Sequence, residues 1–150
     1  MSAAETATFV VARIGKERFA FDVDGVFEAA EAAGLDRVPQ LPAGALGVLR
    51  WRGAAHTVWS PQRVLRVEPD APATVLFFRG ATGLVAVAVD DAEDLITLPR
   101  TELRAMPGIA GATGLIRGGF QAGDVFATVV DTAVFLSGLT QREQDAPRDA

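Results

Sequence analysis

The chain has 150 residues and a formal net charge of −5, and it contains one histidine and no cysteine. A chain of this length forms one domain, or two small barrels that share a core. The lack of cysteine excludes disulfides, thiolate zinc sites and a cysteine nucleophile, and the negative charge argues against a general attraction to nucleic acid or anionic lipid.

Residues 1–6 show no basic region followed by an apolar run, so no secretory signal is visible. The longest apolar stretches, such as GLVAVAV at 83–89, are far short of the ~20 residues that a helix needs to cross a bilayer. We therefore expect a cytoplasmic protein without direct membrane insertion. Residues 1–6 and 140–150 are polar and unpatterned, which predicts a flexible tail on each side of a single domain at 7–139.

The first half of this domain, about 7–67, alternates between strand patterns and turn signals. GVFEAAEAA at 25–33 continues from the second strand, either as a strand or as a short helical turn. A proline-punctuated linker follows, Gly53 marks a hairpin, and PQRVLRV at 61–67 predicts a short helix or turn. The strand patterns are TFVVARIG (8–15), RFAFDVD (18–24), ALGVLRWRG (45–53) and AHTVWS (55–60).

The second half, about 73–139, begins after the clearest internal boundary, the acidic and proline-rich EPDAPA at 68–73. One long strand is predicted over 83–98, and about ten short strands with little helix predict a mainly β fold of barrels. The other strand patterns are TVLFFRG (74–80), TGLIRGG (113–119) and FQAGDVFATVV (120–130), and the short helical segments are RTELRAM (100–106) and DTAVFLSGL (131–139).

Two acidic segments resemble metal sites only in part. DVDG at 22–25 resembles the start of a calcium loop, but its positions 5 and 12 would be Val26 and Ala33, which offer no ligand oxygen from a side chain. DDAEDL at 90–95 gathers four carboxylates, but in an extended segment these alternate in side. We expect the first to be a solvated strand end and the second an exposed edge kept soluble by charge.

No arrangement of residues predicts catalysis. His56 and Ser60 lie four residues apart in one strand pattern, which places them roughly 13 Å apart and beyond the reach of proton transfer. We therefore expect no catalytic residue, no bound metal and no cofactor.

The stretch from Arg37 to Val67 holds five arginines and no acid. Arginine and tryptophan dominate interface hot spots, so the arginines around Trp51, presented by a turn at Gly53, favour a protein-binding surface. Two alternatives stay open. Each arginine could pair with an acid elsewhere in the fold, or Trp51 and Trp59 could stack on nucleic acid in a basic groove.

The order and spacing of these segments resemble the CheW family of chemotaxis coupling proteins over about 7–139. No single motif is decisive, and Trp51 and Arg50 replace the usual leucine and asparagine of the family's L-R-G segment. Thr57 and Trp59–Pro61 also depart from the family pattern, which points to a divergent member. The matching elements are TFVVARIG, RFAFDV, Val26–Phe27–Glu28, Pro42, Gly47–Val48, Arg52–Gly53, Val89–Asp90, DLITLPRTELRAMPG and Asp131.

The resemblance implies two small five-stranded barrels of the SH3 or OB kind, which share a core and exchange strands between the halves. It implies a non-enzymatic adaptor that links the cytoplasmic tips of chemoreceptors to the regulatory domain of a CheA-type histidine kinase, in arrays for chemotaxis or a related form of motility. The family's receptor-binding positions correspond to Val26, Glu28, Val48, Arg50, Trp51, Arg52 and Gly53.

Within that set, Glu28 and Arg52 combine the resemblance with a physical argument. We expect strand pairing to bring them together as an ion pair that orients the guanidinium, while Val26 and Val48 offer apolar contact to a receptor helix. The alternative is that Arg52 only hydrogen-bonds loop carbonyls and shapes the turn.

Overall fold

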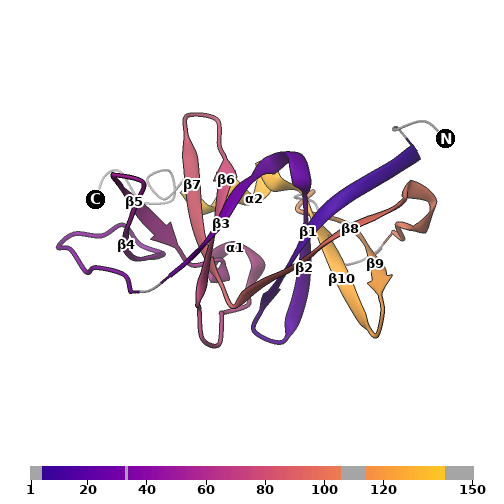
Figure 1. The fold of residues 1–150 in the computed structure, drawn as a ribbon, viewed down its shortest axis with the longest axis horizontal. Coiled ribbons are helices and arrows are strands. Elements are labelled where there is room, and N and C mark those ends of the chain that lie inside the picture. The colour runs from indigo at the N-terminus through magenta and orange to yellow at the C-terminus, as the bar shows by residue number, and fades with distance from the viewer. Residues whose placement is uncertain (1–4, 33, 106–113, 141–150) are drawn as a thin grey trace, which may run out of the picture.

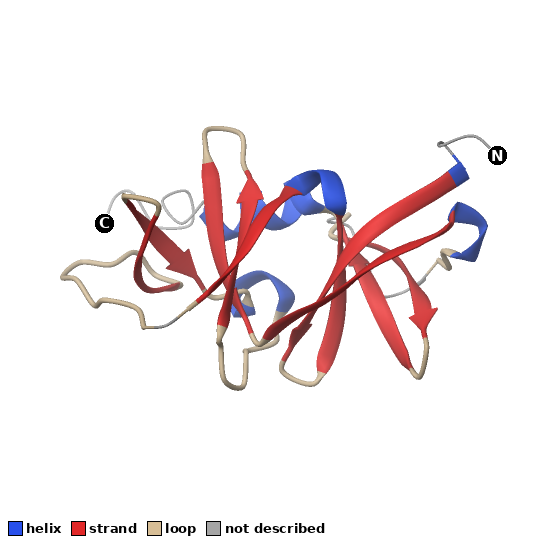
Figure 2. Cartoon of the chain, viewed as in Figure 1, coloured by secondary structure: helices blue, strands red, loops and turns tan. Residues whose placement is uncertain are grey.

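The computed structural model describes residues 5–32, 34–105 and 114–140, and confirms the predicted mainly β fold (Figure 2). The predicted tails lie outside these residues, except for Glu5 and Thr6 of the first and Thr140 of the second; Thr6 begins the first strand and Thr140 ends the last helix. The strands are β1 (Thr6–Ile14), β2 (Glu17–Asp22), β3 (Val26–Glu31), β4 (Ala45–Trp51), β5 (Ala54–Trp59), β6 (Thr74–Arg79), β7 (Leu84–Val89), β8 (Asp91–Pro99), β9 (Ile116–Ala122) and β10 (Val125–Val130). The helices are η2 (Val23–Gly25), α1 (Gln62–Leu65), η3 (Arg100–Glu102) and α2 (Thr132–Thr140).

These strands form two five-stranded sheets that lie side by side along the long axis of the molecule (Figure 1). The terminal sheet has the order β8-β1-β2-β10-β9, and the inserted sheet has the order β3-β6-β7-β5-β4. Strands from both halves of the chain therefore enter each sheet. One parallel pair occurs in each, β2 with β10 and β5 with β7.

Among the residues that the structure describes, each sheet curls until its two edges meet at one backbone bridge. In the inserted sheet, Asp36 and Val48 exchange two hydrogen bonds of 2.9 Å. In the terminal sheet, Arg104 and Gly119 do the same at 2.8 and 3.0 Å. The sheets are thus nearly closed barrels in which one bridge replaces a continuous ladder, because the chain leaves each edge strand before the strands can pair along their length.

Three apolar clusters stabilise this arrangement. One fills the interior of the terminal sheet around Phe9 and Phe120, and another fills the inserted sheet around Phe77 and Val58. The third lies between the sheets and includes both predicted face partners of β2, Phe19 and Phe21. Helix α2 buries Phe135, Leu136 and Leu139 in this central cluster, so it packs where the two sheets meet.

The structure corrects the single long strand that was predicted over 83–98. The run breaks at Asp90, because β7 belongs to the inserted sheet and β8 to the terminal sheet. The apolar run 84–89 passes into the acids Asp90 and Asp91 without a glycine or proline, so no turn signal in the sequence marks the point where the chain passes from one sheet to the other. Residues 25–33, for which strand and helical turn were both open, contain strand β3.

Candidate functional site

The β4–β5 hairpin presents Arg52 and Trp51, which the sequence predicts to lie on a protein-binding surface. Trp51 pairs with Ala54, so the loop is only Arg52 and Gly53, with φ angles of 53° and 81°. Two-residue hairpin loops favour this left-handed backbone, with Asn-Gly as the preferred sequence. A left-handed arginine costs about 1–2 kcal/mol, so the turn accepts a backbone penalty and places a long cationic side chain at its tip.

Strand β3 meets this hairpin through an irregularity in its pairing with β6. Val26 pairs with Phe78 and Glu28 pairs with Phe77, so Phe27 is one extra residue in the strand. Such a bulge breaks the alternation of side chains and redirects them locally. As a result, two consecutive side chains reach the hairpin: Phe27 contacts Trp51 and Glu28 contacts Arg52.

The predicted ion pair is present. The Nη2 atom of Arg52 donates to the Oε1 atom of Glu28 at 2.6 Å, and both side chains are open to solvent, 58% and 38% exposed. Strand pairing is not what joins them, contrary to our expectation, because β3 and β4 are the two opposite edges of the inserted sheet. The pair spans the seam of this sheet, by which we mean the facing edges β3 and β4.

An aromatic stack supports the ion pair from below. The guanidinium of Arg52 lies over the Trp51 ring, with its Cζ atom 4.4 Å from the ring centroid. Trp51 in turn stacks on Phe77 at 4.0 Å and 19° between ring planes, and Phe77 is fully buried in the inserted sheet. Arg52 therefore does not act only on loop carbonyls; its head group is held by a carboxylate and by a ring anchored in the core.

The other three predicted site residues lie outside the group around the Glu28–Arg52 ion pair. Arg50 is exposed on β4 opposite Ala55. Val48 gives its backbone groups to the bridge with Asp36, and Val26 packs against the central cluster between the sheets. The structure thus brings together Glu28, Trp51, Arg52 and Gly53.

Sequence reasoning missed one neighbour of this group. Phe27 is 38% exposed, and its ring lies edge-on to Trp51, with centroids 6.1 Å apart and planes at 89°. The available signal was its position beside Glu28 in the motif. Alternation alone would have turned the two side chains to opposite faces.

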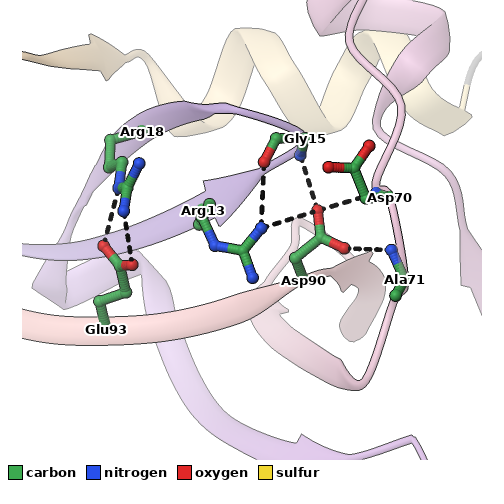
Figure 3. A network of polar contacts seen from close by, with 7 residues as sticks. All are labelled: Arg13, Gly15, Arg18, Asp70, Ala71, Asp90 and Glu93. Carbon is green, nitrogen blue, oxygen red and sulfur yellow. Dashed lines mark hydrogen bonds and ion pairs between the residues drawn. The ribbon is translucent and has the colours of Figure 1, made fainter.

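A second charged cluster lies at the crossover between the sheets and corrects the prediction for Asp90 (Figure 3), whereas Asp91 and Asp94 are exposed on the edge strand β8 as expected. Asp90 is buried rather than part of an exposed edge. Its Oδ2 atom accepts from the backbone N–H groups of Gly15 at 2.6 Å and Asp70 at 2.9 Å, and its Oδ1 atom accepts from Ala71. The carboxylate therefore ties the β1–β2 turn, the segment before β6 and the start of β8 together.

The lowered pKa of Asp90 agrees with its role as a buried hydrogen-bond acceptor. Burial acts to raise its pKa, but the three N–H donors and the nearby Arg13 guanidinium, 3.9 Å away, outweigh burial and hold the pKa below the ordinary value of 3.8. Close by, Arg18 binds both carboxylate oxygens of Glu93 at 3.1 Å (Figure 3). These contacts assign structural roles to two of the four acids in this segment.

The structure also shows where the residues considered for catalysis, nucleic-acid stacking and metal binding lie. The His56 ring lies edge-on to Trp51 and Phe77, 5.8 and 5.1 Å between centroids. Trp59 is buried in the central cluster, so the two tryptophans do not form one stacking surface. Over residues 5–32, 34–105 and 114–140, no group of His, Cys, Asp and Glu is suited to hold a metal ion. In the same part of the chain, no helix combines the length and apolar character needed to cross a membrane.

Comparison with known proteins agrees with the geometry. The model of the CheW-like domain family matches residues 8–139. No curated protein sequence matches the chain. Among solved structures, the scaffolding protein TtCheW from Thermoanaerobacter tengcongensis is similar, with a TM-score of 0.71 and 15% identity over 86% of each chain. At this identity, the likeness to TtCheW shows a shared fold.

Proposed function

This chain belongs to the CheW-like domain family, and we propose that it is a non-enzymatic adaptor that couples chemoreceptors to a CheA-type histidine kinase. The observation that carries the proposal is the Glu28–Arg52 pair over Trp51, an exposed charged group at positions that the resemblance to the family assigns to receptor binding. In this proposal the protein works at receptor arrays on the cytoplasmic side of the membrane.

The proposed receptor contact is a helix packed against the hairpin. Glu28 and the Trp51 ring hold the guanidinium in one orientation before the partner arrives. A side chain that is already ordered loses less conformational entropy on binding. The left-handed backbone at Arg52 supports a role in recognition, since the fold accepts this penalty where asparagine or glycine would avoid it.

Signal transfer in this proposal needs no chemical step. An adaptor transmits a signal when two receptor states contact it, or the kinase through it, with different free energies. A nucleic-acid-binding barrel has less support, because the Trp59 side chain is buried in the central cluster and shares no exposed stacking surface with Trp51.

The test is reconstitution of the full chain with the purified cytoplasmic domain of a chemoreceptor and a CheA-type kinase from the same genome. Arg52→Asn is the informative variant, because asparagine accepts the left-handed turn but cannot form the ion pair. We expect it to weaken receptor binding by about tenfold or more, as hot-spot truncations do, while kinase binding stays unchanged.

Arg104→Asn is the matched control, since it removes one exposed positive charge from the terminal sheet, and it should leave receptor binding unchanged. Wild-type protein that binds neither receptor nor kinase would overturn the proposed function. Binding to a mixed oligonucleotide that falls steeply with salt would favour the nucleic-acid alternative instead.

A further inference from the structure

A second arginine extends a row of contacting side chains across the seam. Arg79 is the last residue of β6, and its Cζ atom lies 4.9 Å from the centroid of the Phe27 ring. Phe27 touches Trp51, Trp51 lies under Arg52, and Arg52 binds Glu28. We call this row the cation–aromatic ladder; its members are Arg79, Phe27, Trp51, Arg52 and Glu28.

The two cations of the ladder differ in how their charge is balanced. Arg52 is neutralised by Glu28 at 2.6 Å. Arg79 is exposed, and within the described part of the chain no salt bridge involves it. An arginine that rests on an aromatic ring keeps its outward N–H groups available, and its planar fork suits a carboxylate.

The fold positions the two aromatic members of the ladder. Trp51 is stacked on the fully buried Phe77, and Phe27 is aimed by the bulge in β3. Exposed aromatic surface flanked by an unbalanced cation is the pattern of an interface anchor, in which apolar contact supplies area and the charge supplies selectivity.

Arg79 also stands where the ladder meets a groove. A groove of about 970 Å³ between the two sheets is lined by Arg79, with Val85 and Leu136 among its apolar residues. A partner helix that covers Phe27 and extends toward the groove would therefore pass Arg79.

We propose that Arg79 is a specificity-determining anchor that selects receptor helices with a carboxylate beside an apolar side chain. This inference rests on the proposed function and assigns the partner's chemistry: the apolar side chain covers Phe27, and the carboxylate pairs with Arg79. Arg52 and Arg79 then act at the two ends of the aromatic pair, so that an acidic helix is held at one end by an open cation and guided at the other by an ion pair already formed.

The first experiment measures the affinity of the full chain for the purified tip hairpin of a chemoreceptor from the same genome, by calorimetry. Arg79→Gln should weaken binding by about fivefold or more, the loss that separates an energetically important interface residue from its near-neutral neighbours. Arg104→Gln, which removes one exposed charge from the other sheet, should stay within about twofold. Equal affinities for these two variants would overturn the inference, and unchanged thermal midpoints would show that both are folded.

The second experiment locates the carboxylate. Each acidic residue of the receptor tip is changed to lysine in turn and tested against Arg79→Glu. One such receptor variant should restore binding to Arg79→Glu and not to Arg52→Glu. If none does so, the carboxylate partner does not exist and the inference fails, while the proposed function stands as long as Arg52→Asn still weakens binding. Failure of the wild-type chain to bind the tip at all would overturn the proposed function, and this inference with it.

Discussion

Glu28 and Asp90 are both carboxylates near an arginine, but they sit in opposite surroundings. Glu28 is 38% exposed and meets Arg52 at the open seam, whereas the Asp90 side chain is 1% exposed and accepts three backbone N–H groups where the chain changes sheets. An exposed pair contributes about 0–1 kcal/mol to stability, while a buried acceptor is costly to remove. The difference separates a group that orients an exposed side chain from one that holds the fold together.

The largest effect should follow removal of the buried acceptor. Asp90→Ala leaves the N–H groups of Gly15, Asp70 and Ala71 without their acceptor, so we expect a loss of about 3–5 kcal/mol in the free energy of unfolding. Urea unfolding measures this loss. Asp91→Ala, at the exposed neighbouring position, is the control and should stay within about 0.5 kcal/mol; similar losses for both would contradict the distinction between the two surroundings.

The same carboxylate should make stability depend on pH. Because the folded pKa of Asp90 lies below its unfolded value of about 3.8, the charged form stabilises the folded state above that value. This stabilisation is lost as the pH falls through 3.8 toward the folded pKa.

We test this dependence by measuring the unfolding midpoints of wild type and Asp90→Asn. The measurements run from about pH 6 to about pH 2.5, which spans the ordinary pKa range of aspartate. Wild type should lose more stability than the variant across the acidic part of the range. Parallel curves would show that other carboxylates control acid unfolding.

A smaller effect should follow a disturbance of the seam itself. A Cβ atom at Gly47 would lie 2.8 Å from the Leu35 Cβ and 2.9 Å from the Asp36 carbonyl oxygen, so Gly47→Ala must push this segment away from β4. We expect a loss of about 1–3 kcal/mol and faster hydrogen exchange of the Val48 amide.

The bridge between Arg104 and Gly119 closes the other sheet and serves as an internal control. Its amides should exchange as slowly in Gly47→Ala as in wild type. Equal loss of protection at both bridges would mean that the variant loosens the whole molecule rather than the seam.

The smallest effect should be the coupling between Glu28 and Arg52. A double-mutant cycle with Glu28→Gln and Arg52→Gln should give a coupling energy of about 0–1 kcal/mol for folding. The coupling should shrink further in about 1 M salt, where the Debye length is about 3 Å. A salt-independent coupling of several kcal/mol would place Glu28 in the same class as Asp90.

Some parts of this structure can be predicted from the sequence better than others. Alternation and turn signals predict the strands and the Gly53 hairpin, because these depend on neighbours in the chain. The break at Asp90 escapes such reasoning, since its acceptor role depends on Gly15, which is 75 residues away. The bulge at Phe27 is likewise fixed by pairing with β6, and the ladder could not be foreseen without it.

In the chain, the strands of the inserted sheet lie between strands of the terminal sheet. This arrangement affects the order in which the two sheets fold during synthesis. All strands of the inserted sheet lie between Val26 and Val89, whereas the terminal sheet needs β1 and β2 as well as strands up to Val130. Pairing between segments so distant in the chain is slow, and domains fold as their residues emerge from the ribosome.

We therefore expect the inserted sheet to form first, while the β1–β2 hairpin waits for β10. In ribosome-bound chains that have emerged as far as Val89, the Val58 amide should already resist hydrogen exchange. The amide of Phe21, which lies in register with Val130, should gain protection only when that strand follows; early protection there would contradict this order. The β4–β5 hairpin would thus be assembled before the terminal sheet.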